Sequence, residues 1–136
     1  MIIKYIFSLD DNRTFKYSVD LNRSYDFSSS HKDAADWCKL EFNQCSNCPL
    51  NKKDYSHCPP AIDLQKVITD FQKIPASAKV KIKVITSERT YYKETNLEVG
   101  VRALIGLVMA TSSCPILSKL KMGLVCLSYP RLQIVF

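Results

Sequence analysis

Glycine and histidine are scarce in this chain of 136 residues, which contains three glycines and two histidines. So few glycines leave no loop of the G-x-x-x-x-G-K or G-x-G-x-x-G kind, in which backbone amides cradle a phosphate. Neither His31 nor His57 lies in a recognisable motif, and nucleophilic catalysis by cysteine would need one of them as a base. The composition therefore argues against the common nucleotide-binding and cysteine-nucleophile enzymes, and we expect a protein that is not an enzyme.

Long hydrophobic runs are also absent. The most apolar internal segment, residues 99–110, is interrupted by Arg102 and is shorter than the roughly 20 residues that a membrane-spanning helix needs. The first ten residues have neither a basic region before a longer apolar run nor a small-residue cleavage site, so they do not read as a signal peptide. We expect a cytoplasmic protein, in which thiols stay reduced and clustered cysteines indicate metal or redox chemistry.

The size of the chain allows one hydrophobic core. We expect a single domain over residues 1–121, followed by an apolar tail, residues 122–136, that is truncated or divergent. The formal net charge is +6, and four thiolates on a divalent metal would lower it to about +4. Because the basic residues are spread along the chain, the charge indicates a solvated, mildly basic surface.

Period-two alternation of apolar and polar residues predicts two β-hairpins. Residues 2–9 and 14–21 alternate around a polar turn, Asp10-Asp11-Asn12-Arg13. Residues 79–86 alternate again, with lysines at every second position, and a turn leads to a partner strand over residues 89–94.

Helical periodicity predicts two helices. Apolar residues at i, i+3, i+4 and i+7 predict a helix over residues 61–73, ended by Pro75. Thr95 and Glu98 have capping-box spacing and predict the start of a second helix, which ends before Pro115. We expect this helix to bury Leu97, Val101, Leu104, Ile105 and Val108.

The order of these elements, β-β-α-β-β-α, predicts an α+β fold. We expect an antiparallel sheet with its helices on one face and a cysteine-rich metal-binding loop between the first hairpin and the first helix.

Four of the six cysteines form the strongest chemical pattern. Cys45 and Cys48 have the CxxC spacing that lets two thiolates reach one ion, and Cys58 follows in the same proline-containing loop. Cys114 comes after the second helix, and a proline follows Cys48, Cys58 and Cys114 alike. The loop from residue 45 to 60 has no apolar periodicity, so it needs something to order it. We predict that Cys45, Cys48, Cys58 and Cys114 bind one metal ion.

The identity of the metal stays open between two candidates. Zn²⁺ would be held tetrahedrally in a closed structural site, whereas an iron–sulfur cluster takes the same four thiolates. We favour zinc, because the tight three-cysteine spacing of ferredoxins is missing. His57 is a second-choice ligand beside Cys58, and we expect Cys38 and Cys126 to be packing residues.

Lys79, Lys81 and Lys83 lie on one face of a predicted strand, with Tyr91 or Tyr92 on the partner strand. A basic sheet face with aromatic residues is one way of binding single-stranded nucleic acid. The alternative, which we favour at this point, is the ordinary polar outer face of a half-buried sheet.

Four segments carry a resemblance to a known family: QCxxCPL at residues 44–50, CPxA at 58–61, ERTYxK at 88–93 and GLxMATSxCP at 106–115. In them the sequence resembles an uncharacterised bacterial family, a domain of unknown function. The resemblance spans residues 2–121 and ends after Lys121. It implies that Cys45, Cys48, Cys58 and Cys114 are the shared cysteines, and it implies no activity.

Two functions follow as hypotheses. The first is a metal-stapled module, with zinc as the metal, that binds a protein partner or, as the less favoured choice, nucleic acid. The second is a redox or electron-transfer protein with an iron–sulfur cluster.

Overall fold

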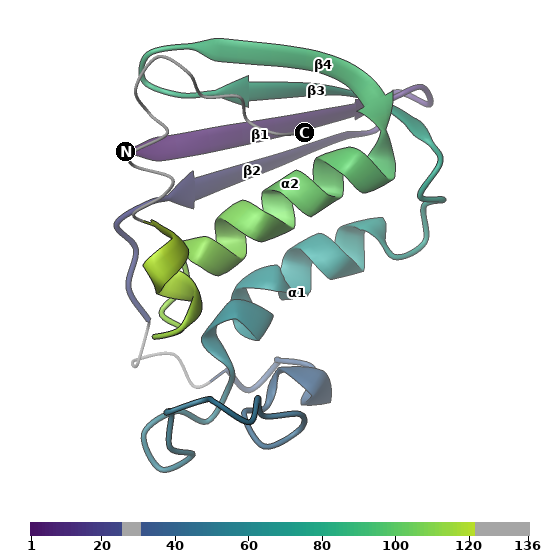
Figure 1. Cartoon of the computed structure of the whole chain (residues 1–136). Coiled ribbons are helices and arrows are strands. Elements are labelled where there is room, and N and C mark those ends of the chain that lie inside the picture. Colours follow the sequence, from purple (N-terminus) through teal and green to yellow (C-terminus); the bar gives the residue numbers. More distant parts are fainter. Residues whose placement is uncertain (26–30, 122–136) are drawn as a thin grey trace.

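The structure is a computed structural model, and it describes residues 1–25 and 31–121. A four-stranded sheet lies on one side and a pair of helices on the other (Figure 1). The elements, in chain order, are β1 (Ile2–Leu9), β2 (Thr14–Asp20), the short 3₁₀ helix η1 (Asp36–Cys38), α1 (Pro59–Phe71), β3 (Lys79–Ile85), β4 (Thr90–Asn96), α2 (Leu97–Ala110) and η2 (Leu117–Leu120).

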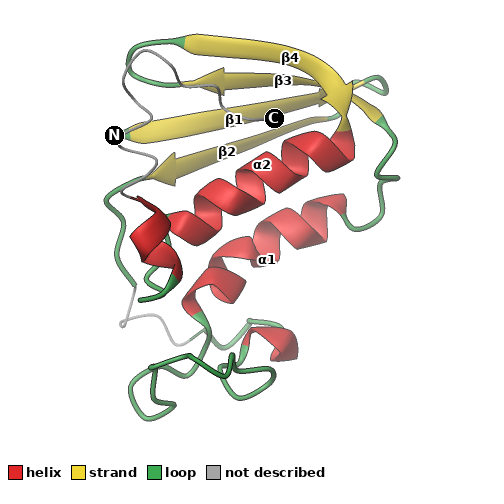
Figure 2. Ribbon diagram, viewed as in Figure 1, coloured by secondary structure: helices red, strands yellow, loops and turns green. Residues whose placement is uncertain are grey.

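The sheet has the strand order β2-β1-β3-β4, and every neighbouring pair is antiparallel (Figure 2). Each predicted hairpin forms, and the two hairpins join through β1 and β3, where Phe7 pairs with Ile82. The predicted α+β fold with the order β-β-α-β-β-α is confirmed. Because side chains alternate along each strand, one face of the sheet is apolar and the other polar.

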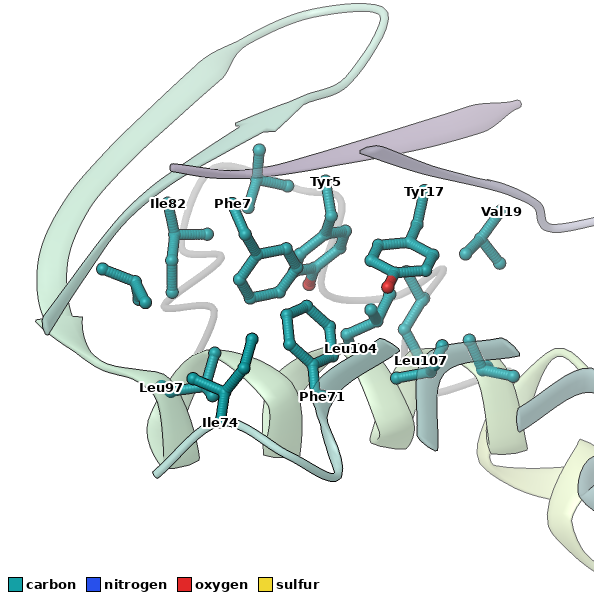
Figure 3. Close-up of a cluster of buried hydrophobic side chains, with 14 of the residues drawn as sticks. Tyr5, Phe7, Tyr17, Val19, Phe71, Ile74, Ile82, Leu97, Leu104 and Leu107 are labelled. Carbon is teal, nitrogen blue, oxygen red and sulfur yellow. The ribbon is translucent and has the colours of Figure 1, made fainter. Parts of the chain in front are cut away.

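The core fills the space between the apolar face of the sheet and the two helices (Figure 3). Phe7 on β1 is fully buried, and its ring lies 5.2 Å from that of Phe71 on α1 and 6.0 Å from that of Tyr17 on β2. Tyr17 keeps its polar end satisfied, because its hydroxyl donates a hydrogen bond of 2.7 Å to Oδ2 of Asp70. The aromatic side chains thus connect both strands of the first hairpin to α1.

Gly100 lets α2 approach the centre of the sheet. A Cβ atom at this position would stand 2.2 Å from Cδ1 of Ile82 and 2.8 Å from Cε1 of Phe7, both far inside normal contact. Gly100 is itself buried. The absence of a side chain at Gly100 therefore allows α2 to lie close to the two central strands, β1 and β3.

Helix α1 begins two residues earlier than the sequence indicated. It starts at Pro59 and Pro60 and not at Ala61. Proline is tolerated in the first helical turn, where the missing amide has no partner to lose and the fixed φ already suits a helix. Cys58, with φ −70° and ψ 120°, is consequently the N-cap residue of α1.

The predicted cap and buried face of α2 each need a correction. Asn96, not Thr95, is the N-cap, and its side-chain oxygen accepts a hydrogen bond of 3.1 Å from the amide of Val99. Val101 and Ile105, expected to be buried, are only partly covered. The face turned to the core is shifted and includes Gly100 and Leu107. A single sequence does not reveal this shift, because α2 is apolar on more than one side.

Candidate functional site

The cysteine loop, which we define as residues 41–58, leaves and rejoins the body of the protein at one place. Lys39 and His57 form an isolated antiparallel bridge at its base. Beside the bridge, the Leu40 amide donates to the Ser56 carbonyl at 3.2 Å, and the Cys58 amide donates to the Cys38 carbonyl at 2.8 Å. Backbone hydrogen bonds therefore fix both ends of the loop.

Between these ends the cysteine loop contains turns and no core. The Cys48 amide donates to the Cys45 carbonyl at 3.1 Å, which closes the CxxC turn. The side-chain Nε2 of Gln44 donates to the Leu50 carbonyl at 3.0 Å, and the Tyr55 backbone amide donates to the Asn51 carbonyl at 2.9 Å. Within residues 41–54, all of which the structure describes, no side chain is buried. Local hydrogen bonds shape this loop, and apolar packing contributes little to it.

The two helices bring Cys58 and Cys114 to the same end of the molecule. Helices α1 and α2 pack against each other and run in opposite directions, so the start of α1 lies beside the end of α2 (Figure 1). Cys58 precedes α1, and Cys114 follows α2 in a turn in which the Ser118 amide donates to its carbonyl at 2.9 Å. Two cysteines 56 positions apart in sequence, 58 and 114, thus lie at neighbouring helix ends.

Arg23 joins the same two helix ends from a third segment. Its guanidinium forms an ion pair with Asp63 in the first turns of α1. Its Nη2 also donates to the carbonyl of Val108 at 2.5 Å and to Oγ1 of Thr111 at 3.1 Å, at the C-terminus of α2. Burial raises the pKa of the Asp63 carboxyl even though Arg23 lies beside it. Arg23 therefore connects the first turns of α1, which follow Cys58, to the C-terminus of α2, which precedes Cys114.

The thiol of Cys58 is electrostatically coupled to the other three predicted ligands. Burial is the largest influence on this group and raises its pKa. The charges of Cys114, Cys45 and Cys48 raise it further. The pKa of Cys58 is thus influenced by each of the other three predicted ligands. The four thiols do not form a finished site, however: within residues 1–25 and 31–121, no three His, Cys, Asp or Glu side chains are placed to hold a metal ion.

Cys38 and His57 have other roles than the four clustered cysteines. Cys38 is fully buried, as expected for a packing residue, and its thiol contacts Oε1 of Gln65 at 3.4 Å. His57, the second-choice ligand, is also buried, and its Nδ1 lies 2.8 Å from the Ser56 hydroxyl. Burial lowers the pKa of His57, and the charges of His31 and Lys39 lower it further. Cys126 lies outside the described residues.

The two histidines of the chain meet in a small aromatic cluster that the sequence did not reveal. The ring centroids of His31 and His57 are 5.4 Å apart, and the Tyr25 ring lies tilted against both His31, at 5.6 Å, and Tyr55, at 5.0 Å. Neither this cluster nor the contacts of Arg23 has a local sequence pattern. Both depend on segments that only the fold brings together.

Comparison with known families gives one match. Residues 3–132 match the family described as "Domain of unknown function (DUF6901)". The chain belongs to the DUF6901 family. This confirms the resemblance to an uncharacterised family, and the matched range of DUF6901 continues past Lys121, where the sequence indicated that the likeness ends. No curated protein and no solved structure matches the chain.

Among the helices of residues 1–25 and 31–121, none has the length and apolar character needed to cross a membrane.

Proposed function

We propose that this DUF6901 chain is a binding module whose cysteine loop is stapled to the helix pair by one Zn²⁺ ion, held by Cys45, Cys48, Cys58 and Cys114. The observation that carries the proposal is the neighbourhood of Cys58. Backbone geometry brings the CxxC turn, the start of α1 and the end of α2 to one end of the molecule. Tetrahedral Cys₄ coordination is the usual form of a structural zinc site.

None of the four thiols is buried out of reach of a metal ion. Cys45 is exposed and the other three are partly exposed, and residues 41–54, which carry Cys45 and Cys48, have no buried side chain to restrain them. The metal binds thiolates, so it replaces four separate protons by one shared cation. Cys58 stands at the N-terminus of α1, where the helix dipole favours a negatively charged sulfur. Metal binding would thus order the loop without changing the sheet.

A binding role fits this site better than catalysis. Four protein ligands leave a zinc ion no open position for water or substrate. An iron–sulfur cluster on the same four thiolates is the alternative, and it would make the protein an electron carrier. The two differ in colour, because a cluster absorbs visible light and Zn²⁺ does not.

The ligand set is tested by metal analysis of protein purified without oxygen. We expect about one zinc per chain in the native protein and a loss of most of it in Cys45→Ser, Cys48→Ser, Cys58→Ser and Cys114→Ser. Cys38→Ser and Cys126→Ser are the matched controls and should keep their metal. Equal loss in all six variants, or no metal in the native protein, would contradict the proposal, and a brown sample containing iron would favour the cluster.

The stapling role is tested separately by hydrogen exchange with and without a strong chelator. Without metal, the amides of the cysteine loop and of the turn around Cys114 should exchange at least about tenfold faster, because residues 41–54 have no buried side chain to hold them in place. The amides of β1 and β3 should keep most of their protection. Equally slow exchange of the loop in both samples would mean that the thiols do not hold it.

A further inference from the structure

The sheet has a second face, which the helices leave uncovered. Both helices lie on the apolar face (Figure 2). On the opposite face, which we call the outer face, every second residue of each strand points outward. Its residues are Ile2, Lys4, Ile6 and Ser8 on β1, Thr14, Lys16, Ser18 and Asp20 on β2, Lys79, Lys81, Lys83 and Ile85 on β3, and Thr90, Tyr92, Glu94 and Asn96 on β4.

Five lysines make this outer face basic. They are Lys4, Lys16, Lys79, Lys81 and Lys83, and all five are exposed. Only two carboxylates share the face. Asp20 lies at the end of β2, and Glu94 lies opposite Lys81 and accepts a hydrogen bond of 3.1 Å from the Tyr92 hydroxyl. Among the described residues, none of the five lysines forms an ion pair of 4.0 Å or less.

The strand register places an exposed aromatic ring among these lysines. Lys16 pairs with Ile6, Ile6 pairs with Lys83, and Lys83 pairs with Tyr92, so the four side chains form one row across the sheet. Neighbouring strands are about 4.8 Å apart, so the row spans roughly 14 Å. Tyr92 is 60% exposed although it is a large aromatic residue. The row therefore offers cations at two positions and an apolar or aromatic surface at the other two.

We propose that the outer face binds single-stranded nucleic acid, with the lysines contacting phosphates and Tyr92 stacking on an unpaired base. Phosphates are attracted by lysines that lie about 7 Å apart along β3. An exposed ring on a flat sheet can stack on any base whose two faces are free, which a single strand provides. This inference rests on the proposed binding function, and it identifies single-stranded nucleic acid as the partner of the module.

Duplex DNA and acidic protein fit the outer face less well. The major groove of B-DNA is about 12 Å wide and admits a helix or a two-stranded ribbon, whereas this sheet has four strands. An acidic peptide would satisfy the lysines but would leave no stacking role for Tyr92. Single-stranded nucleic acid uses both features of the face.

The lysine contribution is tested by fluorescence anisotropy with labelled oligothymidylate and oligouridylate over a series of salt concentrations. The double variant Lys81→Gln/Lys83→Gln should bind about tenfold more weakly at low salt, and the slope of log K against log salt should become shallower by about 1.4. The matched control is Lys53→Gln/Lys73→Gln, which removes the same charge from exposed positions outside the sheet. Equal weakening in both double variants would overturn the proposal.

The stacking contribution is tested at Tyr92. Tyr92→Ala should weaken binding about fivefold or more, while Tyr92→Phe, which keeps the ring, should bind like the native protein. Binding of a matched duplex as tight as that of the single strand would overturn the proposal. So would an unchanged affinity of Tyr92→Ala, or competition by polyglutamate as strong as that by oligothymidylate.

The test of nucleic-acid binding and the test of the metal staple can fail independently. The lysine and tyrosine variants are predicted to keep their full metal content, because the outer face is on the opposite side of the sheet from the helices that carry Cys58 and Cys114. Native protein that is purified without any metal and still binds the oligonucleotide would contradict the staple and leave the outer face supported. Full metal content without binding would contradict the outer face alone.

Discussion

The body of the protein and the cysteine loop are held by different forces. In the body, strands and helices enclose one cluster of buried side chains, with Phe7, Ile82 and Leu104 fully covered. In the loop, residues 41–54 have no buried side chain, and Phe42 is 64% exposed. The body therefore gains stability from removing apolar surface from water, while the loop gains almost none.

This difference explains why the candidate ligands lie where they do. Three of the four cysteines belong to the loop, and the fourth, Cys114, follows α2. Metal coordination between the loop cysteines and Cys114 at the end of α2 would supply the stabilisation that apolar packing does not give the loop. The body would keep its shape either way, and the loop would be ordered by the metal.

The largest expected effect compares two phenylalanines. Phe7→Ala should lower the free energy of unfolding by about 3–5 kcal/mol, because it opens a cavity among Tyr17, Phe71 and their neighbours. Phe42→Ala, the matched change in the cysteine loop, should cost less than about 0.5 kcal/mol. Urea denaturation of both variants measures this. Similar losses in the two variants would mean that Phe42 contributes to the core as much as Phe7 does.

An intermediate effect concerns alkaline stability and Tyr5. Burial raises the pKa of the Tyr5 phenol to about 12, while an unfolded tyrosine ionises near pH 10. As the pH rises, the Tyr5 phenol therefore stays protonated to a higher pH in the folded state than in the unfolded state. This stabilisation is complete below about pH 10 and is lost as the pH rises through about 12, a change of about 2–3 kcal/mol.

Tyr5→Phe isolates this contribution from the other groups that ionise in alkali. Denaturation curves of the native protein and the variant should differ by about 2–3 kcal/mol more at pH 8 than above about pH 12. A constant difference across this range would show that the Tyr5 phenol is not held in a buried site.

The smallest effect tests the start of α2. Asn96→Ala should destabilise the protein by about 1 kcal/mol, since the amide of Val99 loses its side-chain acceptor. Thr95→Ala, at the position that the capping-box pattern indicated, should cost clearly less. Thermal denaturation of the two variants decides which residue caps the helix. A larger loss of stability in Thr95→Ala than in Asn96→Ala would show that Thr95 is the cap, as the capping-box pattern indicated.

Periodic patterns predicted most of the fold. Alternation over residues 2–9 and 79–86 identified β1 and β3, and apolar spacing identified α1. These predictions succeed because the period of a strand or helix fixes which residues share a face, so a local pattern contains the burial information. Details at element ends were less accurate, as the start of α1 at Pro59 shows.

Contacts between distant segments could not be predicted in the same way. No pattern in the sequence marked Arg23, yet it joins Asp63 on α1 to the end of α2. Tyr92 could have faced either side of the sheet. The register of β4 with β3 turned it outward beside Lys83, because a shift of one residue reverses every side chain of a strand.

The sequence by itself determined the set of elements, the polar and apolar faces of the strands and the four cysteines worth testing as ligands. The tertiary structure decided which of these come together: the antiparallel helix pair that places Cys58 beside the end of α2, and the strand order that gathers five lysines on one face. The physical reason is that periodicity is local, whereas the pairing of strands and helices depends on packing the whole core at once.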